Sequence, residues 1–457
     1  MSKQSKLTPK AVDVQQSMMI ACEECGLVVD IPNLNEGEKA TCPRCGHTLI
    51  KAVSLPFQRP VAYGIACLIM LTLSLSFPFL SFTVNGMGHQ ITLLNAVETL
   101  QHFENSVLAV LLMTTVIVFP AAYIVLVLYL YYCAHKVKNI GHVIHARSWL
   151  KFLCRVLFKI QPWLMVDVFL IGVLVSLVKI SALAHIGLGN SFWAFCIYSV
   201  LVVKCVSLVD RTWLWDQFFA MVPVAGVHDG DTHMDNNHVG CHVCNQINPM
   251  PTTHHARCLR CDSRLHIFNV NHSLQYAWAY LFASIVLYIP ANLYPMMYTV
   301  SLGQTEGSTI LGGAILLWKM GSWPIALVIF IASVFIPMVK MFTLAGLYFS
   351  ARKQASSSTH IAIKRLKLYR LAEFIGRWSM VDIFVVAILV ALVQLQNVMA
   401  ISPGPAALCF ATVVIFTMLS AMSFDPRVFW IPKDKSYQQD SELDATESNS
   451  VVPSVHK

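Results

Sequence analysis

Two pairs of cysteine knuckles limit what this chain can fold into more than any other feature. A polar connector joins two Cys-x-x-Cys motifs near the N-terminus, and the same arrangement returns in the middle of the sequence. The cysteines are Cys22, Cys25, Cys42, Cys45, Cys241, Cys244, Cys258 and Cys261. A block of long apolar runs follows each pair of knuckles. The sequence therefore indicates a tandem duplication of one unit, a small cysteine ribbon followed by a membrane block.

Each group of four cysteines has the spacing of a structural zinc site. A Cys-x-x-Cys turn directs two thiolates toward one point, and two such turns complete a closed tetrahedral site. Gly26 and Gly46 follow the second cysteine of a knuckle, where a positive φ is often required. A ribbon this small buries little core, so we expect its metal to be needed for folding. The sequence predicts two zinc ions, in zinc ribbons at residues 17–55 and 236–270.

Disulfides and redox-active dithiols are the alternatives for these cysteines. A disulfide needs an oxidising compartment, whereas the charge distribution described below puts both ribbons in the cytoplasm. In the second ribbon a histidine could replace one cysteine ligand, although we interpret these histidines as solvated loop residues. They are His242, His254, His255 and His266.

The composition outside the ribbons is that of an integral membrane protein. Hydrophobic residues make up 56% of the 457 residues and charged residues 12%, whereas an ordinary soluble domain has about 25% charged residues. A run of about 20 apolar residues spans a bilayer, and each block contains several such runs. The predicted spans are 61–82, 107–131, 165–186, 192–209, 277–298, 324–349, 380–398 and 406–423.

These observations predict an all-α polytopic membrane protein built from two tandem repeats of four transmembrane helices. The membrane modules cover residues 56–215 and 271–432, and each is preceded by a small cytoplasmic zinc ribbon. The tail, residues 433–457, is rich in Ser, Asp, Glu and Gln. A segment of this composition has little to bury, so we expect it to be disordered.

The two modules align with almost no gaps. Pro78 matches Pro295 and Pro120 matches Pro337, because each pair is separated by 217 positions. An even number of spans per module gives both modules the same orientation in the membrane. We therefore expect a pseudo-symmetry axis along the membrane normal.

Lysine and arginine residues fall on one side of the predicted spans. The loop 83–106 contains neither, and the loop 300–323 contains only Lys319. Most others cluster after the second span of each module, in residues 136–159 and 352–377. The positive-inside rule then places both termini and both ribbons in the cytoplasm. The same stretches mix basic and apolar residues at helical spacing, which indicates interfacial helices on the inner membrane surface.

Lys340 is the polar residue inside a span that most suggests a working site. Ionisable groups in spans are costly and tend to face a cavity or a partner, and the matching residue in the first module is Tyr123. Snorkelling of Lys340 to the headgroups is the alternative, and Asp167 and Asp382 could simply complement the positive ends of their helices. We hypothesise a polar cleft within the last four spans. Its candidate residues are Lys340, Asp382, Ser333, Ser379, Thr412, Thr417, Asp167 and Lys179.

The sequence contains no motif that would make this chain an enzyme. There is no Walker loop, no Gly-x-Ser-x-Gly elbow, no His-Glu-x-x-His and no dinucleotide fingerprint. The formal net charge of +8 does not indicate a nucleic-acid partner, because the basic residues flank membrane spans.

The third span of each module begins with a shared motif, Trp-x-x-Val-Asp-[Val/Ile]-Phe, at residues 163–169 and 378–384. Together with the duplicated ribbon and spans, this motif resembles the paraquat-inducible protein A family, which includes the lipophilic envelope-spanning tunnel protein A. The resemblance covers roughly residues 22–432. The shorter, His-rich connector of the second ribbon departs slightly from the family pattern.

The resemblance implies a bacterial inner-membrane protein that works with a periplasmic MCE-domain tunnel protein. Together they would move phospholipids or other lipids between the inner and outer membranes, and the eight ribbon cysteines would be metal ligands. Three other hypotheses fit the sequence. They are a secondary transporter of a small amphipathic solute without a tunnel partner, a membrane redox enzyme that uses the knuckles as dithiols, and a scaffold whose ribbons recruit cytoplasmic protein.

Overall fold

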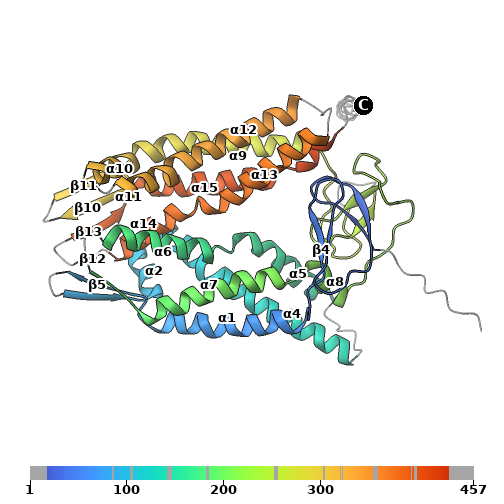
Figure 1. The fold of residues 1–457 in the computed structure, drawn as a ribbon, viewed down its shortest axis with the longest axis horizontal. Helices are drawn as coiled ribbons and strands as arrows, with labels where there is room; N and C mark the ends of the chain where they lie inside the picture. Colours follow the sequence, from blue (N-terminus) through green and yellow to red (C-terminus); the bar gives the residue numbers. More distant parts are fainter. Residues whose placement is uncertain are drawn as a thin grey trace, which may run out of the picture.

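The computed structural model describes most of the chain and is mainly helical (Figure 1). The described residues are 18–84, 87–102, 106–140, 147–181, 185–251, 256–301, 304–319, 321, 323–353, 359–392, 394–395 and 399–431. The predicted disordered tail, 433–457, and two of the candidate histidines, His254 and His255, lie outside them.

The cysteine knuckles lie in the turns of short hairpins. The strands of the first ribbon are β1 (Met18–Ala21), β2 (Val28–Ile31), β3 (Lys39–Thr41) and β4 (Thr48–Lys51), and those of the second are β8 (His238–Gly240) and β9 (Ile247–Pro249). Gly26 and Gly46 have φ angles of 68° and 71°, so the predicted positive φ is confirmed. Asn245 and Asp262 take the matching places in the second ribbon, with φ of 59° and 60°.

The first membrane block contains helices that the apolar runs predict and others that they do not. They are α1 (Gln58–Ser76), α2 (Leu93–His102), α3 (Ser106–Leu112), η1 (Met113–Val118), α4 (Phe119–Ile140), α5 (Arg147–Ile160), η2 (Gln161–Trp163), α6 (Val166–Ser181), α7 (Asn190–Leu208) and α8 (Arg211–Phe218). Asp210 caps α8, because its side chain accepts the backbone N–H of Thr212 at 2.8 Å and of Trp213 at 3.2 Å. This cap separates the last helix of the block from α7.

The second block repeats the first. Its helices are α9 (Val270–Leu293), α10 (Ile310–Lys319), α11 (Trp323–Phe330), η3 (Ile331–Phe335), α12 (Ile336–Lys353), α13 (Thr359–Trp378), α14 (Val381–Leu392), α15 (Pro405–Ser423) and η4 (Pro426–Trp430). A π-helical turn, η1 or η3, directly precedes the helix that carries Pro120 or Pro337. Such turns and prolines both interrupt the regular hydrogen-bond ladder of a helix.

The description of the fold as all-α is incomplete, because two antiparallel sheets close the end of the blocks opposite the ribbons (Figure 1). The first sheet has the order β6-β5-β7 and the second the order β11-β10-β13-β12. The strands are β5 (Leu80–Val84), β6 (Met87–Ile91), β7 (His185–Leu188), β10 (Met297–Ser301), β11 (Gln304–Ser308), β12 (Gln394–Leu395) and β13 (Met399–Pro403). The predicted spans 61–82, 165–186 and 277–298 ran into these strands, since an apolar run does not distinguish a strand from a helix.

Seven helical stretches of the described chain are long and apolar enough to cross a membrane. They are Gln58–Ser76, Leu108–Val137, Ser148–Val178, Asn190–Leu208, Val270–Leu293, Ile331–Ala351 and Pro405–Ser423. The predicted span 380–398 corresponds to α14, which has 12 residues and is followed by β12. At about 1.5 Å per residue, α14 is shorter than the hydrocarbon core. Four spans in each block therefore stay a prediction.

The two blocks lie side by side and meet along α6 and α14 (Figure 1). The rings of Phe169 and Phe384, which are matched residues of the repeat, pack edge to face with centroids 5.5 Å apart. Gly172 allows close approach, because a Cβ atom there would lie 2.9 Å from the Cβ of Phe384. The hydroxyl of Ser176 in α6 donates a hydrogen bond across the same contact to the carbonyl of Val385 in α14, at 3.3 Å. Contact between matched residues is what an approximate two-fold axis requires.

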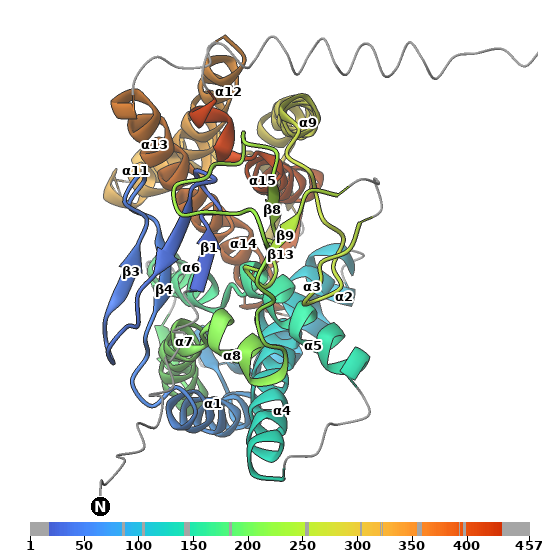
Figure 2. The same ribbon diagram turned by 90° about the vertical axis from the view of Figure 1, so that its right-hand side faces the viewer.

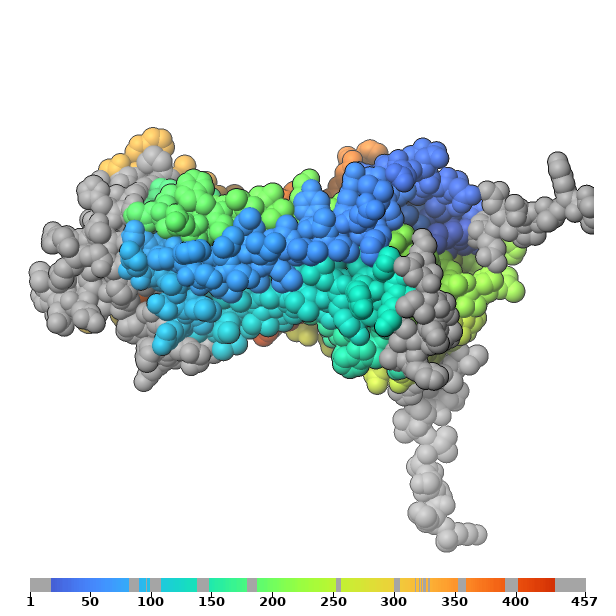
Figure 3. Space-filling model, turned by 90° about the horizontal axis from the view of Figure 1, so that it is seen from below, coloured from blue at the N-terminus to red at the C-terminus, as the bar shows by residue number. Residues whose placement is uncertain are grey.

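Both ribbons cover the same end of the two blocks, but each packs on the block that follows the other ribbon (Figure 2). The cysteines of the first ribbon share a buried cluster with Leu344, Tyr348 and Phe424 of the second block. Those of the second ribbon share one with Cys154 and Trp215 of the first block. Figure 3 shows the first block from below, with the first ribbon in dark blue at one end. The ribbons are therefore exchanged between the blocks.

Candidate metal centres and membrane cleft

Each group of four cysteines can hold a metal ion. The Sγ atoms of each group lie within 4.8 Å of one another, and all eight residues are buried and free of disulfides. Cys22 and Cys45 have sulfurs 3.5 Å apart, and Cys244 and Cys258 have sulfurs 3.6 Å apart. Four thiolates around zinc at about 2.3 Å would stand about 3.8 Å apart. The donor set and its spacing therefore fit a tetrahedral metal ion.

The candidate histidines that the structure describes are not members of the second group. The backbone carbonyl of His242 accepts a hydrogen bond from Arg211 at 2.9 Å. Ser263 lies closer to the sulfurs, with Oγ 3.0 Å from Cys261 Sγ and 3.3 Å from Cys241 Sγ. A hydroxyl in that place can hydrogen-bond a metal-bound thiolate.

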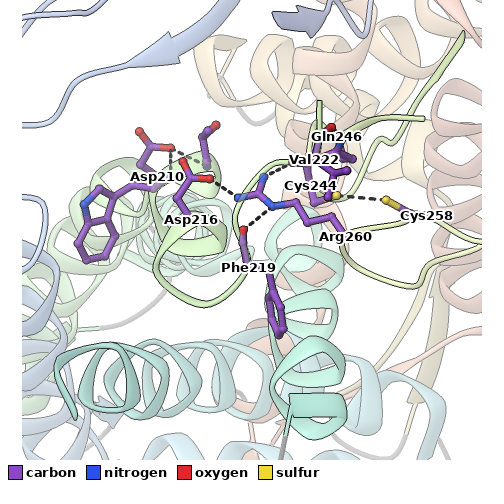
Figure 4. A network of polar contacts seen from close by, with 10 residues as sticks. Asp210, Asp216, Phe219, Val222, Cys244, Gln246, Cys258 and Arg260 are labelled. Carbon is purple, nitrogen blue, oxygen red and sulfur yellow. Dashed lines mark hydrogen bonds and ion pairs between the residues drawn. The ribbon is translucent and has the colours of Figure 1, made fainter. Parts of the chain in front are cut away.

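A buried arginine fixes the second ribbon to the first block (Figure 4). The side chain of Arg260 is fully buried, and its guanidinium forms an ion pair with Asp216 of α8. It also donates to the carbonyls of Phe219 at 2.8 Å and Cys244 at 3.0 Å. One side chain therefore joins a residue of the metal group to the end of the first block.

The first ribbon is fixed by the two glutamates inside its first knuckle. Arg370 of α13 pairs with Glu24 and also donates to the carbonyl of Cys45 at 3.2 Å. Arg211 of α8 donates to Glu23 at 2.8 Å. Burial raises the pKa of Glu24, but hydrogen bonds from His47 and Arg370 outweigh it and lower that pKa to about 2. Glu24 is therefore ionised at neutral pH and pairs as a carboxylate.

A cavity of about 520 Å³ lies between the blocks at the ribbon end. Its apolar wall comes from α5, α7, α13 and α15, with Phe158, Val203, Phe374 and Met422 among the lining residues. Its polar lining comes from both blocks and includes Asp167, Arg211, Lys340, Arg370, Glu373 and Arg377. The cavity is therefore amphipathic, and it lies between the repeats rather than within the last four spans as hypothesised.

Lys340 and Asp167 are the candidate cleft residues that line this cavity. Lys340 is 3% exposed, and its Nζ donates to Thr417 Oγ1 at 2.9 Å. Gly376 lies against the ammonium, since a Cβ there would come within 3.0 Å of Nζ. A lysine this buried does not extend its ammonium to the headgroup region, so the structure argues against snorkelling of Lys340.

The other candidates are spread through the blocks. Ser333 is buried in η3. Ser379, directly after α13, donates to the carbonyl of Ile375, and Thr412 donates to the carbonyl of Leu408 in its own helix, α15. Asp382 stands in the first turn of α14, as Asp167 does in α6. Lys179 belongs to α6, but its side chain lies outside the described part.

The arginines of the cavity are functional candidates that sequence reasoning missed. Arg370 and Arg377 belong to the basic cluster after the second span of the second block, which was interpreted as a topology signal and as an interfacial helix, not as part of a site. Arg211 follows the last span of the first block and stands beside Asp210. A helical wheel of α13 would have placed Arg370, Glu373 and Arg377 on one face, since they are three and four residues apart.

The sequence profile described as Paraquat-inducible protein A matches residues 57–219 and 274–433, which are most of the chain. The chain belongs to the paraquat-inducible protein A family. The two matched segments correspond to the two membrane blocks of the structure. With seven long apolar helices in the part of the chain that the structure describes, this family member is a multi-pass membrane protein.

Named relatives cover nearly the whole length of this family member. Intermembrane transport protein PqiA of Escherichia coli (strain K12) is 40% identical over 426 residues, which are 92% of this chain and 98% of that protein. Lipophilic envelope-spanning tunnel protein A of the same organism is 26% identical, over 93% and 94% of the two chains. A probable intermembrane transport protein of Haemophilus influenzae is 28% identical, over 90% and 95%. No solved structure matches this one.

Proposed function

We propose that this protein is the inner-membrane component of a system that moves phospholipids or other lipids between the inner and outer membranes. The observation that carries the proposal is the cavity between the blocks. Its apolar wall includes residues of the candidate membrane spans α7 and α15 and its lining includes four basic groups, so its polarity matches that of a lipid. The names of the relatives, intermembrane transport protein and lipophilic envelope-spanning tunnel protein, support the same function.

The proposed topology puts both ribbons and both termini in the cytoplasm, with module boundaries at 17–55, 56–215, 236–270 and 271–432. The clusters of basic residues support this orientation by the positive-inside rule. The two sheets would then face the periplasm, where an MCE-domain tunnel protein would receive lipid. A cytoplasmic location also suits thiolate-bound zinc, since thiols stay reduced there.

In this proposal each cysteine group holds one zinc ion and keeps its ribbon folded. Cys22, Cys25, Cys42 and Cys45 would hold one, and Cys241, Cys244, Cys258 and Cys261 the other. Zinc would supply no chemistry to lipid movement, because four thiolates leave no open coordination position. Metal analysis of the purified chain tests this, and free thiols in place of about two zinc ions would favour the dithiol alternative.

Mass spectrometry of the lipids that copurify with the protein tests the function. We expect particular phospholipids to be enriched over the bulk composition of the membrane. A pull-down in the same preparation asks whether a large periplasmic MCE protein is retained. A protein that carries lipid in bulk proportions and retains no such partner would favour a transporter of a small amphipathic solute.

Lys340→Ala tests the cleft itself. The variant removes the buried ammonium that Thr417 binds, and we expect lipid transfer between membranes to fall at least about tenfold, the effect of losing one charge-assisted hydrogen bond. Lys204→Ala is the matched control, because Lys204 lies in α7 but is exposed and does not line the cavity. Equal transfer by both variants would remove Lys340 from the proposal.

A further inference from the structure

The lining of the cavity has more basic than acidic groups. Four basic side chains line it, Arg211, Lys340, Arg370 and Arg377, against two acidic ones, Asp167 and Glu373. The excess is concentrated in the guanidinium groups, and these come from α8 of the first block and α13 of the second. The lining residues alone therefore carry two more basic than acidic groups, and such an excess attracts anionic groups.

Glu23 and Glu24 supply the missing negative charges, although they do not line the cavity. They are the two residues between Cys22 and Cys25, so one rigid turn carries both carboxylates. Glu23 accepts from Arg211 of the first block and Glu24 from Arg370 of the second. The knuckle therefore bridges the two blocks at the end of the cavity, with one carboxylate on each side.

We propose that Arg211 and Arg370 bind the phosphate of an anionic lipid headgroup, and that Glu23 and Glu24 are the counterions that this phosphate displaces. The inference rests on the proposed lipid transport and names the substrate class of the same cleft. A guanidinium binds phosphate oxygens in the same two-pronged way as it binds a carboxylate. A phosphate between the two arginines would replace both glutamates at once.

The apolar wall is what distinguishes a lipid from a free anion in this cavity. Val203 and Val206 of α7 and Met418 and Met422 of α15 line it, and both helices are candidate membrane spans. A phosphate held at Arg211, three residues beyond the end of α7, would let its acyl chains follow these helices. Burying those chains removes apolar surface from water, a gain in binding that inorganic phosphate cannot have.

Binding of dioctanoyl phosphatidic acid to the full-length protein in detergent tests the site. We expect the parent to bind it, and Arg211→Gln/Arg370→Gln to bind at least about tenfold more weakly, because two charge-assisted contacts are lost. Glu23→Gln/Glu24→Gln should bind several-fold more tightly, since neutral amides compete poorly for the guanidinium groups. Unchanged affinity in both double variants would overturn the proposal.

Two matched variants control for charge alone. Arg59→Gln removes an exposed arginine at the start of α1, and Glu38→Gln removes an exposed carboxylate of the first ribbon. Both should bind dioctanoyl phosphatidic acid as the parent does. Zinc content is measured for every variant. Glu23→Gln alone keeps the test valid if Glu24→Gln disturbs the knuckle, because Glu23 pairs with Arg211, whereas Glu24 also pairs with His47 of the same ribbon. An effect of Arg59→Gln as large as that of Arg211→Gln/Arg370→Gln would contradict a specific site.

Dioctanoylglycerol and inorganic phosphate separate the parts of the ligand. We expect dioctanoylglycerol to bind weakly and equally to the parent and the arginine variant, and inorganic phosphate to compete only at high concentration. Competition by inorganic phosphate at the concentrations at which phosphatidic acid binds would assign the arginines to a free anion and overturn the lipid site. If the parent transfers lipid and Arg211→Gln/Arg370→Gln transfers it equally well, this inference is overturned and the proposed function stands. Absence of lipid transfer altogether would instead remove the proposed function.

Discussion

Arg44 and Arg260 occupy the same place in the two ribbons, directly before the last cysteine of each group. Arg44 lies over the ring of Trp430 with its guanidinium 4.5 Å from the ring centroid. Arg260 instead is fully buried against Asp216 and two backbone carbonyls. The repeat explains the difference, because the residue that matches Asp216 in the second block is Ile431. One matched arginine therefore makes a cation–π contact and the other an ion pair.

Replacing Arg260 should damage the second ribbon. Arg260→Met leaves Asp216 and the carbonyls of Phe219 and Cys244 without their donor, and removal of one partner from a buried pair costs about 3 kcal/mol. We expect zinc release from the second group at lower temperature, measured with a zinc-sensitive dye. Arg257→Gln is the control, because Arg257 forms an exposed ion pair with Asp262 that is worth under about 1 kcal/mol. Release at the same temperature in both variants would contradict this role.

Gly189 and Gly404 are matched glycines that precede α7 and α15. A Cβ atom on them would lie 2.0 Å from the carbonyl oxygen of Pro78 and 2.1 Å from that of Pro295, respectively. Both obstacles are backbone atoms, so neither can move aside as a side chain would. The same close approach in both blocks shows that the repeat conserves a joint between the helix and the sheet.

Alanine at either glycine should destabilise its own block. We expect Gly189→Ala and Gly404→Ala each to cost about 1–3 kcal/mol, the range for overpacking a tight site, and to lower the thermal midpoint measured by size-exclusion chromatography after heating. Gly346→Ala in α12 should have the opposite sign, because nothing lies within 4 Å of its Cβ position and alanine is the better helix former. Equal midpoints for Gly189→Ala and Gly346→Ala would show that the joint relaxes.

The cysteine core of each ribbon packs on the block that follows the other ribbon, not on the block that follows it directly in the sequence. The first ribbon packs on the second block and the second ribbon on the first. Cys154 of α5 reports on this exchange, because it is fully buried in the cluster that contains the cysteines of the second ribbon. The first ribbon belongs to a different cluster.

Labelling of Cys154 with a maleimide tests the exchange. Cys241→Ser/Cys244→Ser unfolds the second ribbon through loss of its metal, and we expect Cys154 to become reactive within minutes. Cys22→Ser/Cys25→Ser unfolds the first ribbon, and Cys154 should stay protected. Mass spectrometry of the labelled peptide reads the result. Protection in the first variant and reactivity in the second would mean that each ribbon covers its own block.

Sequence patterns predicted the ribbons and helices themselves better than they predicted which elements pack against one another. The knuckle spacing and the positive φ of Gly26 and Gly46 are local, so residues within the turn determine them. The exchange of the ribbons depends on contacts more than 300 residues apart, such as that between Glu24 and Arg370, and no local periodicity contains them. The strands β5 and β10 were missed for another reason, because the apolar residues continue from helix into strand without a change in hydrophobicity.

At the scale of the whole molecule, neither repeat buries all of its apolar surface by itself. The first ribbon and first block expose surfaces that the second block and second ribbon cover, and α6 meets α14 between them. The segment after α8 also crosses over, since the backbone N–H of Val28 donates to the carbonyl of Asp231 at 2.8 Å. The cavity exists only in the pair, because its arginines come from α8 and α13. Duplication here produced one interlocked unit with a site at its seam.

A chain divided between residues 220 and 221 tests this interlock. The cut lies after α8, so the first fragment carries the first ribbon and block and the second fragment the rest. We expect the two fragments, expressed together, to copurify through a tag on one of them with about two zinc ions per pair. Each fragment expressed alone should aggregate in detergent, because its ribbon lacks the block that buries it and the apolar face of α6 or α14 is open. A cut in residues 354–358, between α12 and α13, is the control for a break in the chain alone, since it leaves the first repeat and both ribbons on one fragment. Separate fragments that are each monodisperse and each hold one zinc ion would show that the repeats fold independently, and the cavity between them would then be a contact of two finished domains.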